Sequence, residues 1–258
     1  TVVFDGLNVT LNDITGGVAG IDFGAAGSTA AGTLTVTTGG AAGDDLTDTG
    51  SLDVSGLMTL DTGAAGNATL DNGANDFDSV TVPDGNNITL VDANAIILNA
   101  FDISGFLDVT AGGNITNAGA LVVAGTADFT GPNASDIILD NGGNNFANAV
   151  NVDASAGTLA NVQIYDLSAL VLGAITVTNN LTVEVGAGDI TSGGSLVVGN
   201  NSDFTAPTGS DIILDDTGND FTGTVTVAAS GVGDLANVTI WDQSALSLAA
   251  LDVTGTLT

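Results

Sequence analysis

The amino-acid sequence predicts an all-β protein that folds as a right-handed parallel β-helix, a solenoid of about a dozen coils. Three observations lead to this fold class. A long segment of the chain recurs, short apolar strands alternate with Gly-, Asn- and Asp-rich turns, and no window of the chain carries the apolar stripe of an amphipathic helix. A length of 258 residues and a hydrophobic fraction of 44% are enough to build a sizeable core.

The repeat has a period of about 75 residues, which is too long for a propeller blade of roughly 40–50 residues. We expect residues 1–32 to form an irregular or N-terminal coil region and residues 33–258 to form the repetitive solenoid. The long repeats cover about 52–120, 121–195 and, in part, 196–258. Pairs of corresponding segments are 117–146 and 192–221, 159–182 and 235–258, and 86–110 and 160–184.

The expected strands have the form Leu-x-Val or Ile-x-Leu, in which every second side chain is apolar. Such alternation over a few residues is typical of half-buried strands, and the pairs Asn-Gly, Gly-Gly and Asp-Gly between them are typical of turns. Stacked coils bring like residues onto like positions, so Asn75, Asn144 and Asn219 should occupy equivalent corners. The apolar pairs that mark expected strands are Leu121/Val123, Ile137/Leu139, Val150/Val152, Val162/Ile164, Leu170/Leu172 and Leu181/Val183.

The charge is one-sided, with 30 acidic residues, no Lys, Arg or His, and a net charge of −30. This composition disfavours nucleic acid and membrane surfaces as partners and removes phosphate clamps and Schiff-base lysines. The absence of His and Cys removes the usual ligands of zinc, copper and iron. The oxygen ligands that remain suit calcium or magnesium. No firm cofactor is therefore expected beyond calcium bound diffusely or in loops.

Three equivalent Asp-rich turns, at 71–76, 140–145 and 215–220, have two interpretations. Carboxylates and loop carbonyls could bind calcium, whereas Asn, Asp and Gly are also the residues that tight turns require. A chain this acidic repels itself, so we also expect its thermal stability to rise with NaCl or calcium near neutral pH.

Other candidate sites have a simpler structural explanation. The adjacent carboxylates Asp44/Asp45 and Asp215/Asp216 could suggest a glycosidase, but neighbours on a strand point to opposite faces. Thr-x-Thr strands at 33–37 and 222–226 could suggest ice binding, but we expect no regular repeat of the threonines. We therefore assign no catalytic, cofactor-binding or metal-ligating residue. Asn-x-Thr sequons, which are acceptors for N-glycosylation, begin at Asn8, Asn67, Asn87, Asn114, Asn180 and Asn237.

Over residues 33–258 the chain resembles the repeats of filamentous-haemagglutinin-type adhesins, which are large secreted bacterial proteins of the two-partner-secretion and autotransporter types. The motifs that carry the resemblance are N-D-F-x-G-x-V-x-V at Asn219–Val227, N-V-T-I-x-D-x-S-A-L-x-L at Asn237–Leu248, V-T-x-x-L-T-V at Val177–Val183 and G-x-L-V-V at Gly119–Val123. The resemblance implies a right-handed parallel β-helix and an extracellular stalk or adhesive fibre, and it transfers no catalytic residue.

The expected function is therefore structural and adhesive, at the surface of a bacterium and without catalysis. The expected partners are another copy of the chain stacked head to tail, adjoining repeats of a longer chain, or a host or matrix glycan. Two alternatives stay open: a calcium-stabilised module that binds a glycan or a receptor, and a polysaccharide-degrading β-helix enzyme.

Overall fold

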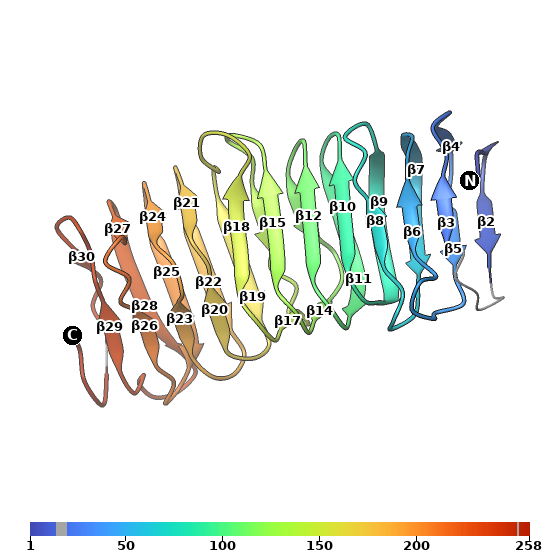
Figure 1. Cartoon of the computed structure of the whole chain (residues 1–258). Helices are drawn as coiled ribbons and strands as arrows, with labels where there is room; N and C mark the ends of the chain where they lie inside the picture. The colour runs from blue at the N-terminus through green and yellow to red at the C-terminus, as the bar shows by residue number, and fades with distance from the viewer. Residues whose placement is uncertain (14–19, 252) are drawn as a thin grey trace. The chain divides into compact units, whose positions relative to one another are not determined.

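The computed structural model describes residues 1–13, 20–251 and 253–258. The chain is an all-β parallel β-solenoid of about 11 turns, which confirms the predicted fold class (Figure 1). The described residues contain no helix, and none of them belongs to a helix that could cross a membrane. Two compact units, Thr1–Ala127 and Asp128–Thr258, make up the chain.

The first unit holds two ladders of parallel strands. One ladder runs in the order β1-β4-β7-β9-β11-β13, and the other runs β3-β6-β8-β10-β12. Beside the first ladder, β2 pairs with β5, β5 pairs with β7, and β14 pairs with β11. The strands are β1 (Asp5–Gly6), β2 (Val9–Asn12), β3 (Ile21–Phe23), β4 (Ser28–Ala30), β5 (Leu34–Thr37), β6 (Leu46–Asp48), β7 (Leu52–Asp61), β8 (Ala68–Leu70), β9 (Asp76–Gly85), β10 (Ile88–Asp92), β11 (Ile96–Ile103), β12 (Leu107–Ala111), β13 (Ile115–Asn117) and β14 (Leu121–Val123).

The second unit holds three such ladders, β16-β19-β22-β25-β28-β30, β15-β18-β20-β23-β26-β29 and β21-β24-β27. The strands are β15 (Ala127–Gly131), β16 (Ile137–Leu139), β17 (Asn145–Phe146), β18 (Val150–Ala154), β19 (Val162–Asp166), β20 (Leu170–Leu172), β21 (Ile175–Val177), β22 (Leu181–Val185), β23 (Ile190–Ser192), β24 (Leu196–Val198), β25 (Ser202–Pro207), β26 (Ile212–Leu214), β27 (Asp220–Phe221), β28 (Thr224–Ser230), β29 (Val238–Ile240) and β30 (Ser247–Leu248).

Parallel pairing joins the strands of one coil to those of the next. In the second unit, for example, Val162 is the partner of Leu181, and Leu181 is in turn the partner of Ser202. Neighbouring strands of a sheet lie about 4.8 Å apart, so each coil advances the solenoid by one strand spacing. The hydrogen bonds between coils therefore run along the direction of stacking.

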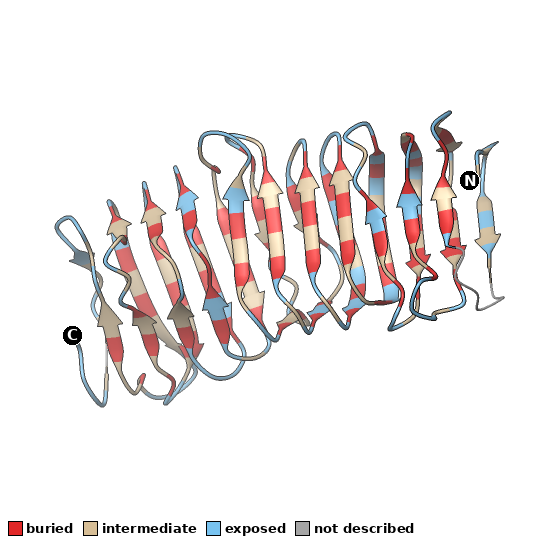
Figure 2. Cartoon of the chain, viewed as in Figure 1, coloured by how far each residue is buried: buried red, intermediate tan, exposed pale blue. Residues whose placement is uncertain are grey.

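The core of each unit is formed by every second residue of its strands, whose side chain faces inward. The alternation of buried and less buried residues along each strand is visible as bands in Figure 2. Leu181 and Val183 of β22 are fully buried, whereas Thr182 between them is only partly buried. The Phe204 and Phe221 rings pack edge to face, with centroids 6.3 Å apart and an interplanar angle of 82°. The apolar pairs expected from the sequence all lie in strands.

Glycines at the turns let the backbones of successive coils approach closely. A Cβ atom at Gly223 would collide with the carbonyl oxygen of Asn200, and one at Gly125 would collide with the carbonyl oxygen of Gly105. At Gly73, by contrast, a Cβ atom would meet nothing within 4 Å. Part of the high glycine content is thus needed for stacking, and part of it is not.

Candidate functional site

The three Asp-rich turns have the same backbone geometry. In each turn the backbone N–H of the last residue donates to the carbonyl of the first residue, three positions earlier. The side-chain oxygen of that first residue accepts from the N–H of the third residue, which closes an Asx turn. The backbone bonds are Asn75 N to Asn72 O (3.0 Å), Asn144 N to Asn141 O (3.0 Å) and Asn219 N to Asp216 O (3.1 Å). The side-chain bonds are Ala74 N to Asn72 Oδ1 (3.0 Å), Gly143 N to Asn141 Oδ1 (3.0 Å) and Gly218 N to Asp216 Oδ1 (2.7 Å).

A fully buried asparagine ends each of these turns. Asn75, Asn144 and Asn219 have no solvent exposure, as expected for equivalent corners. Asn219 accepts a 2.8 Å bond from the Leu196 N–H, which belongs to the preceding coil, and donates a 3.0 Å bond to the Leu214 carbonyl. Because buried polar groups need partners, these amides hold neighbouring coils in register. This geometry fits the interpretation of the segments as turns.

An aspartate on the following coil completes each corner; Asp92 and Asp166 are buried, whereas Asp242 is half-buried. Oδ1 of Asp92 accepts from the Phe77 N–H at 2.7 Å, and Asp166 and Asp242 accept from Phe146 and Phe221 at 3.3 and 3.0 Å. These aspartates were not predicted from the sequence. Their signal is an Asp two residues before Asn94, Ser168 or Ser244, each of whose N–H groups donates back to the carboxylate.

Burial controls the ionisation of the Asp92 and Asp166 carboxyl groups. Loss of solvation, with a smaller contribution from the nearby charge of Asp76, raises the pKa of Asp92 to about 6, although hydrogen bonds from the Phe77 and Asn94 N–H groups act to lower it. Burial likewise raises the pKa values of Asp166 and Asp48. Oδ2 of Asp166 is buried without a hydrogen-bond partner among the described residues. A neutral, protonated carboxyl group tolerates such burial better than a charged carboxylate does.

The carboxylates of the described residues do not gather into a metal centre. No group of three or more His, Cys, Asp or Glu side chains in this part of the chain could hold a metal ion. In the pair Asp44/Asp45, Asp44 accepts from the Ala41 N–H at 3.2 Å, whereas Asp45 accepts from the backbone and side-chain nitrogens of Asn67 at 3.0 and 2.9 Å. The two adjacent carboxylates thus have different partners.

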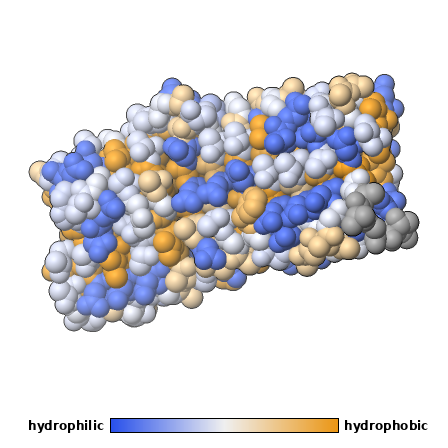
Figure 3. Space-filling model, in the orientation of Figure 1, coloured by the Kyte–Doolittle hydropathy of each residue, from blue (hydrophilic) through white to orange (hydrophobic). Residues whose placement is uncertain are grey.

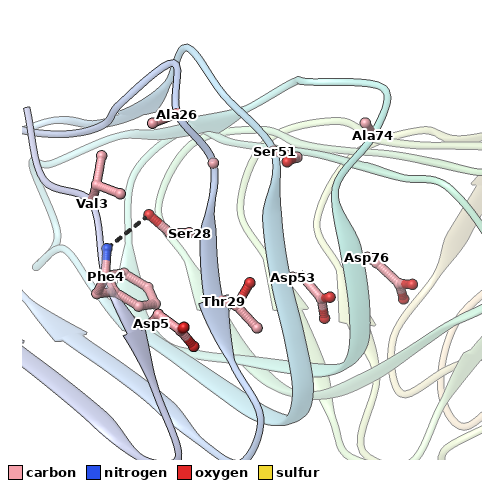
Figure 4. A pocket seen from close by; sticks show the side chains of 11 residues that line it. Val3, Phe4, Asp5, Ala26, Ser28, Thr29, Ser51, Asp53, Ala74 and Asp76 are labelled. Carbon is pink, nitrogen blue, oxygen red and sulfur yellow. Dashed lines mark hydrogen bonds between the residues drawn. The ribbon is translucent and has the colours of Figure 1, made fainter.

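Hydrophilic and hydrophobic side chains are interspersed on the visible surface of both units (Figure 3). An open groove in the first unit has a volume of about 520 Å³. Figure 4 shows Asp5, Thr29, Asp53 and Asp76 along it, on neighbouring strands. The groove is lined by Val3, Phe4, Asp5, Ala26, Gly27, Ser28, Thr29, Ser51, Asp53, Ala74 and Asp76.

The acidic row in this groove follows from strand register. Asp5 pairs with Thr29, Thr29 with Asp53, and Asp53 with Asp76, so the four side chains lie on successive coils, about 4.8 Å apart. Asp53 and Asp76 are both exposed. Neither carboxyl group therefore has the apolar surroundings that the proton donor of a glycosidase uses. The row can attract cations, but it lacks the pair of carboxyl groups that a glycosidase needs, one in apolar surroundings and the other in a polar environment.

A column of threonines lies on the same sheet. Thr10, Thr35, Thr59 and Thr81 are partners on the successive strands β2, β5, β7 and β9. The expectation that threonines do not repeat regularly is therefore wrong for this part of the chain. The period was hidden because the coils differ in length, which shifts equivalent residues in the sequence but not in the sheet. The next outward position on β7 and β9 carries Asp61 and Asp84.

Several sequon asparagines take part in hydrogen-bond ladders between coils. Nδ2 of Asn237 donates to Oδ1 of Asp211 at 2.8 Å, and Nδ2 of Asn180 donates to Oδ1 of Asn161 at 3.3 Å. Oδ1 of Asn180 in turn accepts from the Asn201 N–H at 3.3 Å. Half-buried and bonded on both sides, these asparagines have a structural role in the ladder.

The comparison with protein families concerns the repeat itself. A family model described as "Repeats of unknown function (DUF5649)" matches residues 6–83, 85–153 and 159–228. The chain belongs to this family. Each DUF5649 copy contains one of the three buried corner asparagines, and the second and third copies begin 74 residues apart (159 − 85), the offset found in the sequence for 86–110 and 160–184. No curated protein and no solved structure matches the chain at a significant level.

Proposed function

We propose that this DUF5649 chain is an extracellular structural and adhesive solenoid on a bacterial surface, a segment of a stalk or a self-assembling filament that acts without catalysis. The observation that carries the proposal is the ladder of backbone hydrogen bonds that continues from coil to coil within each unit. In the second unit one ladder connects six strands in succession, from β16 to β30. Each coil is covered chiefly by its neighbours, as in other repeat proteins, so the architecture extends by addition of coils.

The composition of the chain supports a location outside the cell. Without Lys or Arg, the chain has no cleavage site for trypsin-like proteases. The resemblance to filamentous-haemagglutinin-type adhesins over residues 33–258 points the same way. The outward-facing threonines, asparagines and aspartates suit a hydrated surface that could contact a host or matrix glycan.

Coil stacking also supports the expected partner, which is a second copy of the chain or adjoining repeats of a longer one. Among the described strands, β2 pairs with β5 alone. The N–H groups of Val9 and Asp13 donate to the carbonyls of Thr33, directly before β5, and Thr37, at its end, at 2.8 and 2.9 Å. Because successive N–H groups of a strand point to opposite sides, the Thr10 N–H points away from β5. An added strand could pair with this edge and continue the ladder.

A substitution at Thr10 tests self-assembly. Thr10→Pro removes the outward N–H but keeps the bonds to β5, whereas the control Thr10→Ala keeps the N–H and removes only the side chain. We expect sedimentation velocity and electron microscopy in high NaCl to show end-to-end multimers of the parent chain and of Thr10→Ala. Multimers of Thr10→Pro should be fewer or shorter.

A chain that stays monomeric at every concentration and ionic strength would contradict self-assembly and leave the stalk role. Saturable binding of one soluble glycan by such a monomer, dependent on calcium, would favour the binding-module alternative instead.

A further inference from the structure

The chain contains two Asn-Gly dipeptides, Asn72-Gly73 and Asn141-Gly142, and both lie in equivalent Asp-rich turns. We propose that Asn72 and Asn141 are sites of spontaneous deamidation in the folded protein. This inference is independent of the proposed function, because it rests on the chemistry of the turns alone. The attacking group is the backbone nitrogen of the glycine, and the co-reactant is water.

The reaction has two steps. First, the glycine nitrogen forms a bond to Cγ of the asparagine, the bond from Cγ to Nδ2 breaks, and Nδ2 leaves as ammonia with the proton that the glycine N–H gives up. Water then adds to either carbonyl of the resulting succinimide ring and opens it. Opening on the side-chain side yields aspartate, whereas opening on the main-chain side yields isoaspartate, in which the chain continues through the side-chain carbon.

The geometry of the turns keeps the reacting atoms together. The bond from the Ala74 N–H to Oδ1 of Asn72 closes a ring that includes both Cγ of Asn72 and the nitrogen of Gly73. The bond from the Gly143 N–H to Oδ1 of Asn141 does the same in the second turn. Gly73 and Gly142 are exposed, and a Cβ atom at either glycine would meet nothing within 4 Å. Water and base therefore have open access to the glycine side of each dipeptide.

The third copy of the turn shows what the aspartate product would look like. Asp216 occupies the position of Asn72 and Asn141, and its carboxylate accepts from the Gly218 N–H at 2.7 Å in the same Asx turn. An aspartate at 72 or 141 would thus fit the turn. Isoaspartate adds a backbone atom between this residue and Asn75 or Asn144, so it would displace a buried asparagine and weaken the contact between coils.

The experiment follows both amides by mass spectrometry of the intact, folded chain held at mildly alkaline pH. Samples are digested with pepsin in acid, which stops deamidation and does not need Lys or Arg. We expect Asn72 and Asn141 to convert many times faster than the exposed Asn94 and the bonded Asn133, each of which is followed by alanine. The same chain unfolded in urea supplies the reference rate for the unstructured dipeptides.

Two matched variants separate the sites. Gly73→Ala should slow conversion of Asn72 several-fold and leave Asn141 unchanged, and Gly142→Ala should do the reverse, because a Cβ atom hinders ring closure. Neither glycine has a positive φ, so neither alanine strains the fold. Aged chain should lose thermal stability in proportion to its isoaspartate content, whereas Asn141→Asp should melt close to the parent. Amides at 72 and 141 that survive in the folded chain while those of the unfolded chain react would overturn the proposal, as would equal rates in the alanine variants.

Discussion

Asp48 and Asn75 lie 27 residues apart in the sequence and are joined by a 2.7 Å hydrogen bond from Nδ2 of Asn75 to Oδ2 of Asp48. Oδ1 of Asn75 meanwhile accepts from the Leu52 N–H at 2.8 Å. One buried amide thus connects the end of β6, the start of β7 and the turn before β9. In a chain without Lys, Arg or His side chains, neutral donors of this kind take the place of cations as partners of the buried carboxylates.

The corner asparagines should therefore be important for stability. Asn219→Ala leaves the Leu196 N–H and the Leu214 carbonyl without partners in the interior, and each orphaned group costs about 1–3 kcal/mol. Urea unfolding followed by circular dichroism measures the loss. Asn200→Ala, at an exposed position whose side chain donates only to Asn180, is the control and should cost much less. Equal losses of stability in the two variants would show that the corner asparagine contributes no more than an exposed one.

Stability should fall as the pH rises from about 4 to about 6. The folded chain holds the Asp92 proton more tightly than the unfolded chain, because the pKa of this carboxyl group is about 6 in the fold against an ordinary value of 3.8 for Asp. The stabilising contribution of the protonated group is full below the unfolded pKa and is lost as the pH passes through the folded one. The buried Asp166 and Asp48, whose pKa values are also raised, act in the same direction.

The melting temperature across this pH range, at constant ionic strength, measures the effect. Asp92→Asn should show a smaller difference between the acidic and neutral melting temperatures than the parent. Asp203→Asn, which removes a carboxylate flanked by Thr182 and Thr226 on the neighbouring strands, should keep the parent's difference. A melting temperature that increases toward neutral pH would contradict the raised pKa values.

Salt should stabilise the chain near neutral pH because like charges lie opposite one another on neighbouring strands. Asp53 is the partner of Asp76, and Asp61 is the partner of Asp84. Such pairs destabilise a sheet, and salt screens them. Asp84→Asn should reduce the rise in melting temperature with NaCl, whereas Asp203→Asn should change it less. Calcium chloride and NaCl at equal ionic strength distinguish a bound ion from screening, and no response to either salt would refute the prediction.

The edge-to-face pair of Phe204 and Phe221 should be coupled energetically. Removing a buried aromatic ring costs about 3–5 kcal/mol when it is replaced by alanine, and an aromatic pair adds about 0.5–1.5 kcal/mol beyond burial. A double-mutant cycle of Phe204→Leu and Phe221→Leu, measured by urea unfolding, should return a coupling in this range. A coupling energy of zero would mean that the two rings contribute only through the area that they bury.

The turn glycines should differ sharply in their tolerance of alanine. Gly223→Ala forces a Cβ atom against the Asn200 carbonyl oxygen, and overpacking of this kind costs about 1–3 kcal/mol. Gly73→Ala meets no atom within 4 Å and should leave the melting temperature nearly unchanged. Similar melting temperatures for the two variants would show that the backbones of the two coils at Gly223 and Asn200 are far enough apart to accommodate a Cβ atom.

The fold class and many strands could be predicted because they depend on local alternation. The spacing of Leu121 and Val123, or of Leu181 and Val183, is enough to predict that both residues are buried. The offsets between repeats place Asn75, Asn144 and Asn219 at equivalent corners. These signals survive changes in turn length, since each one is read within a few residues.

Relationships between coils were much harder to predict. The spacing of Asp92 and Asn94 marks a local turn, but it does not indicate that Asp92 also accepts from the Phe77 N–H, 15 residues earlier. Likewise, no motif indicates that Thr10, Thr35, Thr59 and Thr81 form one column. Such contacts depend on the length of each coil, which varies along this chain. The acidic groove was missed for the same reason, because Asp5, Asp53 and Asp76 become neighbours only through strand register.

The corner bonds have a consequence for how such proteins change in length over generations. The oxygen of the Asn219 amide accepts from the Leu196 N–H of the preceding coil, as that of Asn75 accepts from the Leu52 N–H, and an equivalent asparagine recurs in each of the three DUF5649 copies. Recombination that gains or loses one whole copy therefore keeps an N–H donor opposite the asparagine oxygen at the new junction. Loss of a fraction of a copy would instead leave a buried polar group without a hydrogen-bond partner. Selection on folding alone therefore favours whole-copy duplications and deletions.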